Sequence, residues 1–195
     1  MRLLTAALLS ASLMGLAACS KADPSEAIDA AKDAAGAAAA KAESMADGAA
    51  DQAKQAAVDA REAAFKKSAI EADRWLAANG GRPDVVTLPS GLQYTVNKAS
   101  DNPGNSPAPG QMVKVHYEGK LIDGTVFDSS YERGAPASFP SDRLIKGWVE
   151  ALGMMSPGDE WTLYVPPNLA YGPRGTRGIP GNAVLIFRME LLEHL

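Results

Sequence analysis

Hydrophobic and polar positions follow three different patterns along the chain, and each pattern predicts a different part of the protein. Residues 3–16 form an apolar run that only small or hydroxyl side chains interrupt. Over residues 22–78, small apolar residues recur at helical spacing, with charged residues between them. From residue 84 onward, short alternating segments are separated by glycine and proline, which predicts strands and turns.

The N-terminal apolar run is shorter than a typical transmembrane helix and is typical of a signal peptide. It ends in a Leu-Ala-Ala-Cys sequence at 16–19, which resembles the bacterial lipobox. We therefore expect a lipoprotein signal peptide over 1–18 and an acylated Cys19 that anchors the chain stably in a membrane. Ser20 favours sorting to the outer membrane by the same resemblance, and we expect the domain to face the periplasm. The alternative is an ordinary secretory signal followed by an incidental cysteine.

The segment over 22–78 predicts a long helix, because it is rich in alanine and only Gly36 and Gly48 interrupt it. An Asn-Gly-Gly sequence at 79–81 then supplies a helix stop. The apolar stripe is nearly all alanine and buries little area, so we interpret residues 19–81 as a tether. The alternative is that this segment is a dimerisation arm. The larger side chains gather near its end: Phe65, Ile70, Trp75 and Leu76. These are expected to dock on the following domain or on another subunit.

The remaining segment, over 84–195, predicts an α+β domain. Strand patterns lie at 92–96, 112–117, 161–165 and 183–192, and Asp123-Gly124 marks a hairpin. One helix is expected over 145–155, where apolar residues recur at helical spacing. A sheet with one helix must bury its apolar face on that helix, and Trp148 is the largest side chain available for the contact.

Composition and charge exclude several classes of function. The formal net charge of −4 argues against a general nucleic-acid binder. One cysteine and two histidines are too few for a zinc site built from these side chains. A single cysteine also excludes a disulfide within the chain. Ten of the 12 aromatic residues follow residue 80, so only this part carries the side chains for a substantial core.

Short motifs follow one another between about residues 110 and 194. They are Val115–Gly119, Asp123–Ser130, Leu144–Trp148, Met155–Gly158, Leu169–Gly172 and Ile179-Pro180 leading to Phe187. Their order resembles that of an FKBP-type peptidyl-prolyl isomerase, and the Ser-Tyr-Glu-Arg-Gly run at 130–134 resembles the bacterial Mip/FkpA-like branch. The resemblance implies an antiparallel sheet of about five strands wrapped around one short helix.

The resemblance also implies a reaction, the rotation about Xaa-Pro bonds in proline-containing polypeptides. No covalent bond breaks, so the reaction needs no nucleophile, metal or cofactor. Water bound to the carbonyl favours the planar amide, and a dry aromatic pocket that accepts a twisted amide lowers the barrier. Slow proline isomerisation limits folding, which gives such an enzyme a use in the bacterial envelope. Inhibitors of the FK506 and rapamycin type are implied ligands.

Candidate site residues come from the same resemblance. Those expected to line the pocket are Tyr117, Phe127, Phe139, Leu144, Ile145, Trp148, Ile179 and Phe187. Trp148 is expected at the floor, under the proline ring. The Ile145 N–H and the Tyr171 hydroxyl are expected to hold substrate carbonyls. Asp128 is expected at the rim, where its charge stabilises the twisted amide.

Two alternatives and two local features complete the interpretation. One alternative is that the domain is a chaperone module that binds proline peptides with little turnover. The other is that it is part of a structural envelope lipoprotein. Gly181 stands where the family usually has a second proline, which predicts a looser loop. The run at 172–178 lacks the ending of a phosphate loop, so its two arginines are expected to form a solvated face.

Overall fold

The computed structural model describes residues 24–195, and the predicted signal peptide and Cys19 lie outside them. The chain forms two compact units that divide inside the first helix, between Gln55 and Ala56. Within the described residues, no helix combines the length and the apolar character that a membrane crossing requires.

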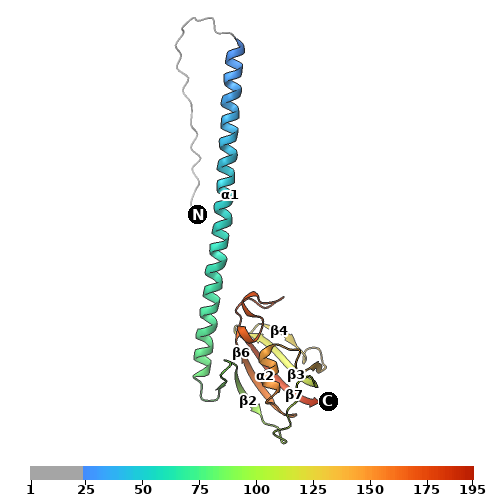
Figure 1. Ribbon diagram of the computed structural model, residues 1–195. Coiled ribbons are helices and arrows are strands. Elements are labelled where there is room, and N and C mark those ends of the chain that lie inside the picture. The colour runs from blue at the N-terminus through green and yellow to red at the C-terminus, as the bar shows by residue number, and fades with distance from the viewer. Residues whose placement is uncertain (1–23) are drawn as a thin grey trace. The chain divides into compact units, whose positions relative to one another are not determined.

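Helix α1 spans Pro24–Gly80, so the long helix and its predicted end are confirmed (Figure 1). Its last turn is completed by a residue of the following domain. The Gln93 side chain donates to the Leu76 carbonyl at 2.9 Å and accepts from the Asn79 side chain at 2.9 Å. A Cβ on Gly80 would lie 2.7 Å from Gln93 Nε2, so glycine makes room for this cap. The helix end is therefore tied to the sheet.

The domain is built on one antiparallel sheet. Its strands are β1 (Val86–Thr87), β2 (Gln93–Lys98), β3 (Met112–Leu121), β4 (Val126–Ser129), β5 (Ala137–Pro140), β6 (Glu160–Val165) and β7 (Leu185–His194). They lie in the order β1-β2-β6-β7-β3-β4, and β5 pairs with β3. The α+β class is confirmed, with seven strands rather than about five. The two additional strands, β1 and β5, are short.

Helix α2 (Lys146–Leu152) packs on one face of the sheet and closes the core (Figure 1). Trp148, Ala151 and Leu152 are buried against side chains of β3, β6 and β7. The alternating burial of β3 and β7 follows from the period of two in a strand, because every second side chain faces α2. The predicted contact through Trp148 is therefore confirmed.

The C-terminal part of α1 belongs to the same compact unit as the sheet. Trp75 contacts Tyr164 of β6, with ring centroids 5.7 Å apart, and Arg82 donates to the Tyr164 hydroxyl at 3.2 Å. Phe65 and Ile70 remain exposed, at 45% and 51%. Of the apolar cluster expected to dock, Trp75 is thus the member whose ring meets an aromatic ring of the domain.

The Trp75 contact predicts a difference between two aromatic truncations in one helix. Trp75→Ala should lower the free energy of unfolding by about 2 kcal/mol, because the half-buried indole loses its contact with Tyr164. Phe65→Ala, which removes an exposed ring, should change it by less than about 0.5 kcal/mol. Denaturant unfolding, followed by the fluorescence of the core residue Trp161, measures both changes. Equal losses of stability would contradict a specific contribution of the contact between α1 and the sheet.

Candidate active site

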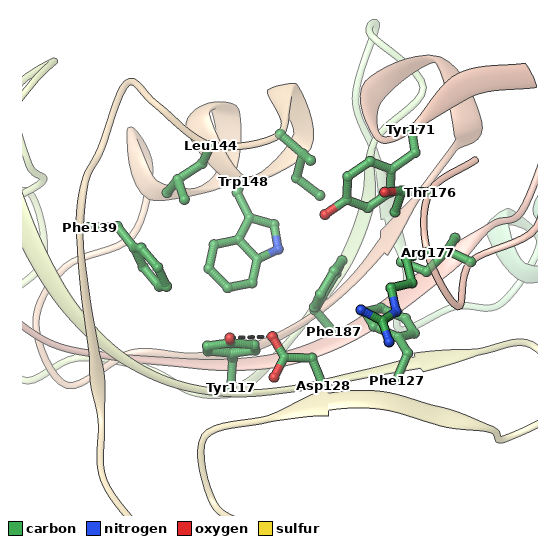
Figure 2. Close-up of a pocket in the computed structure, with 12 residues that line it drawn as sticks. Tyr117, Phe127, Asp128, Phe139, Leu144, Trp148, Tyr171, Thr176, Arg177 and Phe187 are labelled. Carbon is green, nitrogen blue, oxygen red and sulfur yellow. Dashed lines mark hydrogen bonds between the residues drawn. The ribbon is translucent and has the colours of Figure 1, made fainter. Parts of the chain in front are cut away.

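A cavity of about 370 Å³ opens between α2, the sheet and the loop that precedes β7. Figure 2 shows the side chains that line it. They include all ten residues singled out in the sequence as pocket or catalytic residues, which the fold brings together from distant parts of the chain. Thr176 and Arg177 also line it, although neither was expected there and Arg177 was expected on a solvated face.

Edge-to-face aromatic contacts shape the cavity around Trp148. The Trp148 ring lies 5.0 Å from that of Tyr117 and 5.1 Å from that of Phe187, at interplanar angles of 79° and 82°. Phe139 approaches it at 6.2 Å and 75°. Such arrangements place positive ring edges on negative ring faces and stabilise the cluster beyond its buried area. Trp148 is only 4% exposed, so it forms a fixed floor.

Close backbone packing brings the rings together. Gly119 of β3 lies beneath Phe127 and Phe187, and a Cβ there would lie 2.6–2.7 Å from both rings. The two rings meet edge to face at 5.6 Å, and Phe127 comes from β4 while Phe187 comes from β7. A larger residue at 119 would therefore push this wall of the cavity outward.

A hydrogen-bonded network of three side chains forms the polar rim. The Tyr117 hydroxyl donates to Asp128 Oδ2 at 2.5 Å, and Arg133 forms an ion pair with Asp128 Oδ1. Arg133 Nη2 also donates to the Tyr117 hydroxyl at 2.9 Å, with the guanidinium 5.4 Å from the ring centroid. Arg133, which lies in the 130–134 run but was not expected in the site, thus holds both groups in place.

This network shifts two pKa values. Burial acts to raise the pKa of Asp128, but the hydrogen bonds from Tyr117 and Arg133 outweigh it, and the net shift is downward. The pKa of Tyr117 is raised, first by burial and then by its hydrogen bond to Asp128. At neutral pH the rim therefore holds a charged carboxylate and a protonated phenol.

Two further groups offer hydrogen bonds to a ligand. Ile145 precedes α2, and its carbonyl accepts from the N–H groups of Trp148 and Val149. In the described part of the chain, neither the Ile145 N–H nor the Tyr171 hydroxyl has a hydrogen-bond partner. Figure 2 shows the Tyr171 ring reaching over the cavity with its hydroxyl directed inward. Both residues line the cavity, so these donors are available to a ligand there.

The loop before β7 is closely packed, despite its glycines. Its base is closed by the Asn182 N–H, which donates to the Gly172 carbonyl at 3.0 Å. A Cβ on Gly181 would lie 2.2 Å from the Pro173 carbonyl oxygen. The looseness expected from Gly181 is therefore not what the structure has, because glycine here permits a close backbone contact. The Asn182 side chain donates to the Phe65 carbonyl and to Ser68 Oγ of α1, at 3.2 and 3.1 Å.

Comparison with known proteins agrees with this geometry. The family described as FKBP-type peptidyl-prolyl cis-trans isomerase matches residues 104–192, and the domain amino terminal to such isomerases matches 12–96. The crystal structure of FkpA from Escherichia coli superposes with a TM-score of 0.69 and 33% identity, covering 89% of this chain and 83% of that one. The chain belongs to the FKBP-type peptidyl-prolyl isomerase family.

Sequence relatives place it within the family. The peptidyl-prolyl cis-trans isomerase Mip of Coxiella burnetii is 53% identical over 120 residues, which are 61% of this chain and 51% of the relative. An FKBP-type 22 kDa peptidyl-prolyl cis-trans isomerase of Escherichia coli is 46% identical over 136 residues, 69% of this chain and 65% of the relative. The chain thus spans about half to two thirds of the length of these curated relatives, and the resemblance to the FKBP family is confirmed.

The rim of this FKBP domain predicts a specific titration. Arg133→Gln should raise the pKa of Asp128, because the guanidinium that lowers it is lost while burial remains. Arg188→Gln is the matched control, since Arg188 pairs with Glu160 at 2.7 Å outside the pocket. NMR titration of the carboxyl carbons should show the Asp128 midpoint moving only in the first variant.

The same shift sets the direction of the pH effect on stability. The pKa of Asp128 is lower in the folded state than in the unfolded state. Its contribution to the free energy of unfolding is therefore fully present at a pH above the unfolded pKa, and it is lost as the pH falls through the folded pKa. This acid-dependent loss should be smaller in Arg133→Gln than in the native chain. An Asp128 midpoint that does not move would show that Arg133 does not control the carboxylate.

Proposed function

We propose that the chain is a peptidyl-prolyl cis-trans isomerase that rotates Xaa-Pro bonds in proteins of the bacterial envelope. The observation that carries the proposal is the cavity itself, an apolar floor of crossed aromatic rings whose edge holds hydrogen-bond donors without a partner among the described residues. A proline ring fits a floor made by Trp148, and the flanking peptide carbonyls fit the Ile145 N–H and the Tyr171 hydroxyl.

The floor lowers the barrier by excluding water. Rotation passes through a twisted amide that has lost its resonance, against a barrier of about 18–20 kcal/mol for an ordinary peptide. Water that hydrogen-bonds the carbonyl oxygen favours the planar, polarised amide, so its removal raises the ground state relative to the twisted one. Phe139 and Phe187, which contact the Trp148 ring, carry no N–H or O–H group, which suits the less polar twisted state.

The rim completes the site by holding charge near the amide. Both oxygens of Asp128 are engaged, one by Tyr117 and one by Arg133, so the carboxylate is fixed in direction and partly neutralised. A fixed carboxylate stabilises the more positive carbonyl carbon of a twisted amide without reorganising. Because Arg133 offsets part of its charge, the effect of Asp128 is expected to be moderate.

An isomerase assay with paired conservative variants tests the proposal. The full chain in detergent should accelerate cis/trans exchange of Xaa-Pro peptides, measured by NMR exchange spectroscopy. Asp128→Asn should lower kcat/KM about tenfold, which corresponds to about 1.4 kcal/mol. Tyr171→Phe should lower it by about fivefold, because only the donating hydroxyl is removed.

Tyr131→Phe is the control for the loss of a phenolic hydroxyl. Tyr131 stacks on His116 at 4.7 Å and does not line the cavity, so kcat/KM should remain at the native value. Binding of proline peptides without any acceleration would favour the chaperone alternative. Equal losses in Tyr131→Phe and Tyr171→Phe would contradict the assignment of Tyr171.

We further propose that acylated Cys19 anchors the isomerase in the outer membrane, facing the periplasm. The support is the lipobox-like sequence before the single cysteine. One relative, from Legionella longbeachae, is named outer membrane protein MIP. Pairing of two chains through α1 into a homodimer stays a prediction, which sedimentation analysis of the detergent-solubilised chain would decide.

A cysteine-to-serine substitution tests the anchor. The native protein should fractionate with membranes, and its intact mass should exceed that of the chain from residue 19 by the mass of the acyl groups. Cys19→Ser should move the protein into the soluble fraction, because no thiol is left to acylate. A native N-terminus without added mass would rule out lipidation.

A further inference from the structure

Arg177 is the charged residue of the cavity whose partner is missing. Asp128 and Arg177 are the charged members of the lining, and Asp128 is paired with Arg133. Within residues 24–195, Arg177 has no hydrogen bond or ion pair, and it is exposed. The mouth of the cavity therefore carries one positive charge that no described side chain compensates.

The loop holds Arg177 in a defined place. Thr176 and Ile179 exchange two backbone hydrogen bonds of 2.9 Å, so Arg177 and Gly178 form the tip of a tight turn. Gly178 has a φ of 80°, which suits glycine at such a tip. A Cβ on Gly175 would lie 2.3 Å from the Ile179 carbonyl oxygen, so the base of the turn is closely packed.

The turn fixes where the Arg177 side chain leaves the backbone. Figure 2 shows the Arg177 guanidinium on the side of the cavity where Phe127 and Asp128 lie. Ile179, at the other end of the turn, is buried in the cavity wall, whereas Arg174, which precedes the turn, does not line the cavity. A peptide bound over Trp148 would therefore have Arg177 and Asp128 along the same side.

We propose that Arg177 selects substrates with an acidic residue directly before or after the proline, an inference that rests on the proposed isomerase function. A guanidinium offers paired donors that match the two oxygens of a carboxylate. Arg177 is exposed, so solvent screens this attraction and the expected preference is modest. Asp128 does not repel such a substrate strongly, because Arg133 already offsets its charge.

Matched peptide pairs measure this selectivity. One pair carries Glu or Gln before the proline, and the other carries Glu or Gln after it. The readout is the Glu-to-Gln ratio of kcat/KM at low ionic strength, for the full native chain, Arg177→Gln and Arg174→Gln. The ratio for at least one pair should be about two- to fivefold higher in the native chain than in Arg177→Gln. Arg174→Gln should keep the native ratio, and added salt should reduce it.

The outcomes separate this inference from the function on which it rests. Equal ratios in the native chain and Arg177→Gln for both pairs would overturn the selectivity, and so would an equal decrease in Arg174→Gln. If no peptide is turned over, the proposed function fails, and calorimetric affinities of the same pairs then test Arg177 alone. Arg177→Lys should keep a weaker preference, which supports the inference even if the glutamine variant folds poorly.

Discussion

The close approach of α2 to the sheet is the constraint on which the site depends. A Cβ on Gly147 would lie 2.6 Å from Val165 Cγ1, so only glycine lets the helix settle this far onto β6. The next residue, Trp148, then lies low enough to form a floor that Tyr117 and Phe187 meet edge-on. A helix held further away would leave a shallower cavity with a loose indole, because aromatic contacts weaken quickly with distance.

The regular elements could be predicted because their patterns are long enough to be unambiguous. The ten residues of β3 and of β7 alternate in burial along most of their length, and this follows from their sequence. The strand β5 gave no such signal, since it has four residues, ends in Pro140 and gains its place by pairing with β3. Short edge strands are fixed by their partners rather than by their own pattern.

The candidate site could be predicted where its residues lie in motifs that follow one another in the family's order. The site residues outside this prediction owe their place to turns and to contacts made in the folded chain. Arg133 lies in the 130–134 run that indicated the bacterial branch, but its contacts with Asp128 and Tyr117 depend on the turn that brings it back to them. Asn182 adopts a φ of 59° and bonds to α1 over more than a hundred residues of chain. Arg177 lines the mouth of the cavity because the turn at Thr176–Ile179 brings its backbone there.

These contacts separate the chemistry of the cavity from its selectivity. Charge buried in the floor would cost several kcal/mol and would bring water or a counter-ion with it, which would restore the hydration that a twisted amide must lose. The fold instead keeps the floor aromatic and holds its charges at the mouth, where solvent offsets that cost. In the proposed isomerase, rotation depends on the rings around Trp148 and on Asp128, while Arg177 acts on what flanks the proline. The rim can therefore change its substrate preference through the loop before β7 while α2 and the sheet keep the floor unchanged.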